Sequence, residues 1–232
     1  GSAATQSIAP AVYKNLSYQS PQAFQPITMV AQIPVALVVN PEVKANTVQE
    51  LLALAKNQKD PLTFASSGTG AIPHLAGELF KMQTKTFITH IPYRGAGPAL
   101  SDLIAGQVEM MFDGLGSSSQ HIKSGKIKAL AVAATKRSPA FPDVPTAAEA
   151  GVPGYVVSTW YGLWAPKGTP KDVVDKMTAE VTKALNSPEL KSSWLNNGSD
   201  TPNLTGEAYG KFVSAEIKRW AEVAKASGAK LD

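Results

Sequence analysis

The chain has 232 residues, of which 44% are hydrophobic, and a formal net charge of +4. This length suffices for one large domain or for two lobes. The chain contains no cysteine, which excludes disulfides and thiolate metal sites, and its Lys and Arg residues are scattered rather than gathered into the basic stripe of a nucleic-acid-binding protein. No apolar run approaches the roughly 18 residues that span a bilayer, so the sequence predicts a soluble chain that binds no nucleic acid.

The first part of the chain predicts one short helix, two strands and a longer helix. Apolar residues recur at helical spacing over 8–16. The run PITMVAQIPVALVVN is rich in strand formers and is interrupted by Pro34, which predicts separate strands over 27–33 and 35–39. A capping box then predicts a helix over 47–57.

The stretch LTFASSGTGAIPHLAGELFKMQTKTFITHIPYRGAG contains the same arrangement twice. Each copy is a short apolar strand, a glycine-rich turn and an amphipathic helix. The helix of the second copy is expected to open with Pro98. The strands are expected at 62–65 and 87–91, and the turns that follow them at 66–70 and 93–97. Two such units in tandem predict a parallel sheet whose helix N-termini gather at the carboxyl ends of the strands.

This geometry directs unpaired backbone N–H groups and positive helix ends toward one crevice, which suits an anion. Small and hydroxyl side chains in both turns let a ligand approach the backbone closely. They are Ser66, Ser67, Gly68, Thr69 and Gly70 in the first turn, and Gly95 and Gly97 in the second. The alternative interpretation is a pair of ordinary strand-to-helix turns whose Ser and Thr side chains act only as helix caps.

The rest of the chain predicts three further strands and several helices. The strands are expected at 108–112, 127–133 and 156–164, and the helices at 117–124, 146–150, 171–185, 188–196 and 205–227. Proline and glycine punctuate residues 138–154, which favours a connection between lobes. Residues 1–40 and 135–232 are therefore expected to form a first lobe, and 41–134 a second, with two crossing segments as a hinge.

The sequence offers no convincing catalytic or metal site. The spacing of His74, His90 and His121 matches no common metal-ligand pattern, and His90 lies in an apolar strand where a structural histidine is favoured. A Ser66–His90–Asp113 set can be drawn, but no G-x-S-x-G elbow supports it. The GTGAIP run has proline where a nucleotide-binding loop needs its third glycine. We therefore expect no enzyme, no cofactor and no metal.

Four side chains have both a binding and a structural interpretation. Asp113 follows a buried strand and either borders the crevice or caps the next helix. Arg94 either clamps a carboxylate or pairs across the hinge. Trp160 and Tyr161 either cover an organic ligand or pack in the core.

Four motifs occur in a fixed order: SSGTGAIPHLAGELF, HIPYRGAGPALSDLIAGQVEMMFDGL, IKALAVAATKRSPAFPDVPTAAEAGVPGY and STWYGLWAPKGTP. Together they resemble the periplasmic solute receptors of tripartite tricarboxylate transporters, the Bug family. The resemblance covers nearly the whole chain. It implies an α/β, two-lobed periplasmic-binding-protein fold of type II, with parallel-type sheets flanked by helices and a hinge of the Venus-flytrap kind.

The resemblance also implies a periplasmic, monomeric receptor that binds a small organic carboxylate and delivers it to membrane permease subunits. Matched motif by motif, the ligand contacts are Ser66, Ser67, Gly68, Thr69, Gly95, Ala96 and Asp113 in the second lobe and Ser2 and Thr5 in the first, to which the aromatic strand adds Trp160. In the family an N-terminal part with a Pro-Gly-Gly loop and a signal peptide precedes this sequence. Its absence here predicts an incomplete pocket, and Gly1-Ser2 is either native or a cloning remnant.

Two other functions remain open at this point. The effector-binding domain of a LysR-type transcription factor has the same architecture, and a DNA-binding helix-turn-helix upstream would distinguish it. A transferase that uses the same crevice would turn its ligand over. The sequence does not identify the carboxylate, since backbone amides and water provide no side-chain template.

Overall fold

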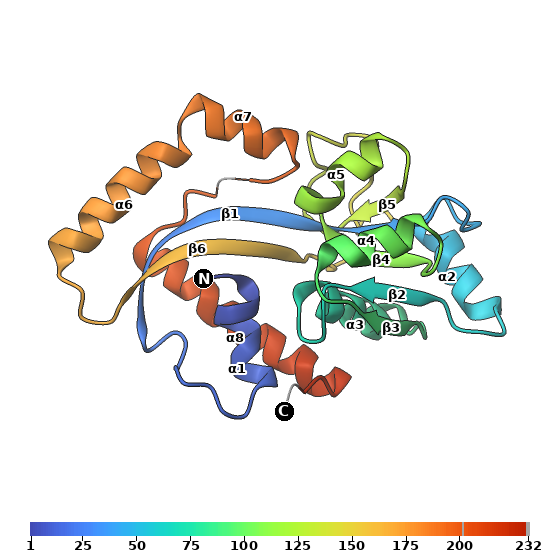
Figure 1. Cartoon of the computed structure of the whole chain (residues 1–232), viewed down its shortest axis with the longest axis horizontal. Helices are drawn as coiled ribbons and strands as arrows, with labels where there is room; N and C mark the ends of the chain where they lie inside the picture. Colours follow the sequence, from blue (N-terminus) through green and yellow to red (C-terminus); the bar gives the residue numbers. More distant parts are fainter. Residues whose placement is uncertain (201, 231–232) are drawn as a thin grey trace. The chain divides into compact units, whose positions relative to one another are not determined.

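The computed structural model describes residues 1–200 and 202–230 (Figure 1). The chain divides into two compact units. Unit 1 consists of Gly1–Ile33 and Thr159–Asp232, and unit 2 of Pro34–Ser158. Two strands, β1 (Phe24–Val39) and β6 (Ser158–Pro166), run from one unit into the other. The unit boundaries therefore lie within these strands, whereas the sequence placed the lobe boundaries after residues 40 and 134.

The sheet has the strand order β3-β2-β4-β1-β5, and β6 also pairs with β1. The strands not yet given are β2 (Thr63–Ser66), β3 (Thr89–Pro92), β4 (Met110–Gly114) and β5 (Lys128–Val132). The pairs β2–β3 and β2–β4 are parallel, as the repeated strand–turn–helix pattern predicts. In contrast, β1 runs antiparallel to β4 and β5, so the sheet is mixed.

Strand β1 is continuous through Pro34, and the prediction of two separate strands is wrong. Its ladder with β4 begins at Val35, opposite Gly114. Pro34 therefore lies just outside that ladder, where its missing N–H costs no hydrogen bond to β4.

Four helices belong to unit 2. They are α2 (Val48–Asn57), α3 (Ile72–Thr84), α4 (Ala96–Ile104) and α5 (Leu115–Lys123). The connections β2–α3–β3 and β3–α4–β4 run in opposite directions along the sheet, so right-handed crossovers place α3 and α4 on opposite faces (Figure 1). On the α3 face, Phe80 and Phe112 pack with ring centroids 5.2 Å apart. The predicted helix cap is confirmed, because Glu50 N donates to Thr47 Oγ1 at 3.1 Å.

Unit 1 is mainly helical beside its two strands. Its helices are η1 (Ala4–Ile8), α1 (Ala9–Val12), α6 (Lys171–Leu185), α7 (Pro188–Asn196) and α8 (Gly206–Ser227). The bounds of α6 and α7 are those that the sequence predicts. Helix α8 packs against η1 and α1 (Figure 1). Trp160, Tyr209 and Trp220 are almost wholly buried.

Two further observations limit the kind of site to expect. Among the described residues, no helix is both long enough and apolar enough to cross a bilayer, and no three His, Cys, Asp or Glu side chains gather where they could hold a metal ion. The helix predicted over 146–150 is wrong. Thr146 forms an isolated bridge with Val132 and residues 147–150 form turns, and Thr146 N donates to Glu149 Oε2 at 2.7 Å.

Candidate functional site

The carboxyl ends of β2, β3 and β4 meet at one edge of the unit 2 sheet. Because β2 lies between β3 and β4, the turn after β2 adjoins the turns after both neighbours. Two hydrogen bonds join the first two turns directly, from Tyr93 N to Ser66 O at 3.0 Å and from Gly95 N to Ser67 O at 3.2 Å. The two glycine-rich turns that the sequence singles out are thus one connected surface.

Three glycines of this surface, Gly68, Gly70 and Gly95, have positive φ angles. Gly68 and Gly95 have φ angles of 137° and 114°, which residues with a Cβ rarely adopt. A Cβ on Gly95 would meet no atom within 4 Å. The backbone of Gly95 therefore faces open space that a ligand can enter.

Helix α4 begins at this surface. Its N-cap is Gly95, no side chain caps it, and its first turn contains no acidic residue. The helix starts before Pro98, where the sequence placed its opening, because Gly95 turns the chain two residues earlier than expected. The N–H groups of Ala96 and Gly97 consequently have no partner within the helix and lie at its positive end.

Ser66 and two histidines lie beneath the first turn. The Ser66 hydroxyl is 2.5 Å from His90 Nε2 and accepts a hydrogen bond from Gly68 N at 3.1 Å. His74 Nδ1 accepts from Gly70 N at 3.1 Å, and the two imidazoles stack with centroids 4.0 Å apart. The Ser66 side chain is therefore occupied inside the turn, and the hydroxyl groups nearer the surface are those of Ser67 and Thr69.

Both histidines are neutral at pH 7. Burial is the main cause that lowers the pKa of His90 to about 4, and the neighbouring His74 and Lys81 contribute to the same shift. Burial likewise lowers the pKa of His74. His90 is thus a hydrogen-bonded structural histidine, as its apolar strand indicates. The Ser66–His90–Asp113 triad does not form, because Asp113 lies on β4, which β2 separates from the β3 strand of His90.

Asp113 ends β4 and has an exposed fraction of only 2%. Its Oδ2 accepts a hydrogen bond from Ser117 Oγ at 2.6 Å. Burial raises the pKa of this carboxyl to about 6, although hydrogen bonds from Ser117, Gly114 and Ser118 oppose the shift. The N-cap of α5 is Gly114, so the interpretation of Asp113 as a helix cap is wrong. Sequence reasoning missed Ser117, for which the Asp-x-x-x-Ser spacing is a weak signal.

The remaining predicted contacts belong to unit 1. Ser2 and Thr5 bond to each other, with Ser2 N donating to Thr5 Oγ1 at 2.9 Å and the two hydroxyl oxygens 3.3 Å apart. Trp160 is completely buried, and its Nε1 donates to Glu216 at 3.4 Å. Its indole therefore fills the core of unit 1 and has no surface for a ligand, contrary to the sequence expectation. The next side chain along the strand, Tyr161, is 47% exposed.

A mixed α/β chain in two units, traversed by two strands and carrying joined glycine turns at a helix N-terminus, is the architecture of periplasmic binding proteins. Residues 1–229 match the family described as "Tripartite tricarboxylate transporter family receptor". The chain belongs to this family, whose members are binding proteins rather than enzymes.

Two curated relatives illustrate the match. The chain is 38% identical over 212 residues to the "UPF0065 protein in tcbD-tcbE intergenic region" of Pseudomonas sp. strain P51, covering 91% of this chain and 63% of the relative. It is 35% identical over 217 residues to "Protein BugT" of Bordetella pertussis, covering 94% of this chain and 67% of the relative. The chain thus spans about two thirds of the length of these relatives.

Three solved structures share the fold. R. palustris Rpa4515 with adipate has a TM-score of 0.90 at 34% identity, covering 100% of this chain and 78% of that chain. The periplasmic binding protein BugD has a TM-score of 0.88 at 35% identity, covering 99% and 77%. MatC (Rpa3494) from Rhodopseudomonas palustris with bound malate has a TM-score of 0.86 at 33% identity, covering 96% and 77%.

Proposed function

We propose that this protein is a periplasmic receptor that captures a small organic carboxylate and delivers it to a membrane transporter. The observation that carries the proposal is the joined pair of glycine turns at the uncapped N-terminus of α4. Backbone N–H groups at a helix N-terminus suit a carboxylate without an arginine. Family membership supports the receptor role, and the adipate and malate bound to Rpa4515 and MatC support the ligand class.

In this proposal the ligand carboxylate takes hydrogen bonds from the N–H groups that open α4, at Ala96 and Gly97. The Ser67 and Thr69 hydroxyls are the side-chain donors of the first turn, and Gly68 and Gly95 provide the close approach. Asp113 lies at the end of the third parallel strand and contacts the ligand through water or a neutral ligand group, since its charge would repel a second carboxylate. We also propose that Ser2 and Thr5 of unit 1 contact the ligand.

Two broader features belong to the same proposal. The periplasmic location and the membrane permease partners are proposed from the family, whose members are receptors of a transporter. Because residues 1–229 match this family, we propose the receptor function rather than the LysR-type or transferase alternative.

A dicarboxylate is expected to raise the melting temperature of the protein. At a ligand concentration of a hundred times its dissociation constant, binding to the folded state alone adds about 2.7 kcal/mol to the free energy of unfolding. For a chain of this size this corresponds to an increase of about 5–10 °C. Calorimetry with adipate, malate, succinate and glutamate measures the shift.

The matched control is adipamide, which has the length of adipate without its charge. No shift with any of the four acids, or an equal shift with adipamide, would contradict carboxylate recognition.

A further inference from the structure

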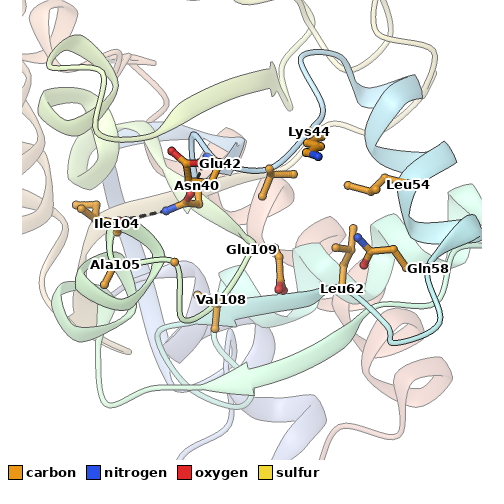
Figure 2. Close-up of a pocket in the computed structure, with 12 residues that line it drawn as sticks. Asn40, Glu42, Lys44, Leu54, Gln58, Leu62, Ile104, Ala105, Val108 and Glu109 are labelled. Carbon is orange, nitrogen blue, oxygen red and sulfur yellow. Dashed lines mark hydrogen bonds between the residues drawn. The ribbon is translucent and has the colours of Figure 1, made fainter.

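A pocket lies at the opposite edge of the unit 2 sheet from the glycine turns. It has a volume of about 690 Å³ and lies where β2 and β4 begin and β1 ends. Figure 2 shows its side chains around a central space, with Asn40 and Ile104 on one side and Leu54 and Gln58 on the other. This volume is in the range of small-molecule sites.

One wall of the pocket is held by Asn40. Its Nδ2 donates to Leu103 O at 2.8 Å and to Ile104 O at 3.1 Å, while its Oδ1 accepts from Glu42 N at 2.8 Å. Asn40 thereby binds the last carbonyl groups of α4 and fixes the loop that follows β1. The wall is preformed, and it presents the negative end of the α4 dipole to the pocket.

A carboxylate held in place lies beside this wall, since Asn40 N donates to the Glu109 backbone O at 3.0 Å. Glu109 Oε2 accepts two hydrogen bonds from Thr63, from the backbone N at 2.7 Å and from Oγ1 at 2.6 Å. Among the described residues, Oε1 of Glu109 has no hydrogen-bond partner. Oε1 is therefore available to a hydrogen-bond donor in the pocket. The Glu109 carboxylate is already held in place, so it needs no reorganisation to accept that hydrogen bond.

The charge of the pocket is the reverse of that of the glycine turns. Its ionisable lining residues are two carboxylates, Glu42 and Glu109, and one ammonium, Lys44. Glu42 and Lys44 are exposed, whereas Glu109 is partly buried, so Glu109 is the least screened of the three charges. The remaining surface includes the aliphatic side chains of Leu54, Leu62 and Ile104.

We propose that this pocket binds a small organic cation, with a primary ammonium on the carboxylate of Glu109 and an apolar body among the aliphatic side chains. An ammonium supplies donors only, which suits the open Glu109 oxygen, and its positive charge suits the negative end of the α4 dipole. A carboxylate ligand would meet two like charges and the negative helix end. The pocket is thus a separate site from the carboxylate-binding turns, at the other end of the same strands.

The test uses three probes with one ring and different charges: cyclohexylammonium, cyclohexanol and cyclohexanecarboxylate. Each is titrated at pH 7 into the full chain with labelled methyl groups, and the resonances of Leu54, Leu62 and Val108 are followed by NMR. Cyclohexylammonium is expected to shift these methyl resonances, with saturation at millimolar concentration, because a ligand of this size binds with a dissociation constant in that range. Cyclohexanol is expected to bind at least fivefold more weakly, and the carboxylate not to shift these signals.

Two variants move the affinity in opposite directions. Glu109→Gln keeps an oxygen acceptor for Thr63 but loses the charge, and it is expected to weaken cyclohexylammonium binding at least fivefold. Lys44→Gln removes a like charge at an exposed position and is expected to strengthen binding about twofold. Glu180→Gln, at an exposed position on α6 of unit 1, is the matched control and is expected to change nothing.

The outcomes separate cation recognition from simple filling of an apolar hollow. Equal shifts from the amine and the alcohol, no saturation, or unchanged affinity in a folded Glu109→Gln variant would overturn the proposal. If Glu109→Gln fails to fold, the exposed Lys44 position decides alone, and weaker or unchanged binding in Lys44→Gln overturns it.

Discussion

Replacing Gly95 by valine is expected to abolish carboxylate binding, with a loss of more than about 100-fold, whereas Arg94→Ala is expected to cost about tenfold or less. The φ angle of 114° at Gly95 strains any residue with a Cβ, and a branched side chain most of all. Because a Cβ there would point into open space, it would occupy the volume that the ligand carboxylate needs. Arg94 is exposed and contributes only long-range attraction in this arrangement.

Calorimetric titration with the acid that gives the largest thermal shift measures both variants. Gly125→Val is the matched control, because Gly125 also has a positive φ angle, of 71°, and open space at its Cβ but lies in the turn after α5, outside the glycine turns. Circular dichroism checks that Gly95→Val remains folded. Loss of binding in Arg94→Ala together with retained binding in Gly95→Val would show that the guanidinium, and not the backbone, holds the carboxylate.

Replacing Asp113 by asparagine is expected to stabilise the folded protein at pH 7 by about 1–2 kcal/mol. Burial raises the pKa of Asp113 to about 6 from its usual value of 3.8, so the folded state holds this proton more tightly than the unfolded state does. Stability from this group is therefore greatest below pH 3.8 and is lost as the pH rises through 6. Asparagine removes that cost but weakens the hydrogen bond from Ser117, which leaves a smaller net gain.

Urea unfolding at several pH values measures this effect. The stability difference between Asp113→Asn and the original chain is expected to shrink steadily as the pH falls from 7 to 4. Asp143→Asn, at an exposed position, is expected to show no such trend. If the stability of Asp113→Asn relative to the original chain were instead lower at pH 7 than at pH 4, the folded protein would stabilise the ionised form of Asp113.

The features that the sequence predicts well are those with local causes. The helices at 171–185 and 188–196 have the predicted bounds because their apolar spacing and the proline after Ser187 define them within a few residues. The joined turns were predictable for the same reason, since glycine is the residue that adopts the positive φ angles found at Gly68 and Gly95.

The features that the sequence misses depend on packing between distant segments. Trp160 and Tyr161 point to opposite faces of β6, and only the position of α8 decides which face is the core. The antiparallel direction of β1 depends on pairing with β4, some 75 residues later in the chain. The lobe assignment and the unit 1 contacts of the ligand stay predictions.

Folding of unit 2 changes proton binding in opposite senses at His90 and at Asp113. Over the same acidic range, the unfolded chain would protonate His90 while the folded chain keeps it neutral, and the folded chain would hold a proton on Asp113 that the unfolded chain has released. Between about pH 4 and pH 6 one of these sites therefore gains the proton that the other loses. Burial lowers the pKa of His74 as well, so the carboxyl at the end of β4 offsets only part of the acid sensitivity that the stacked histidines beneath the first turn give to the fold.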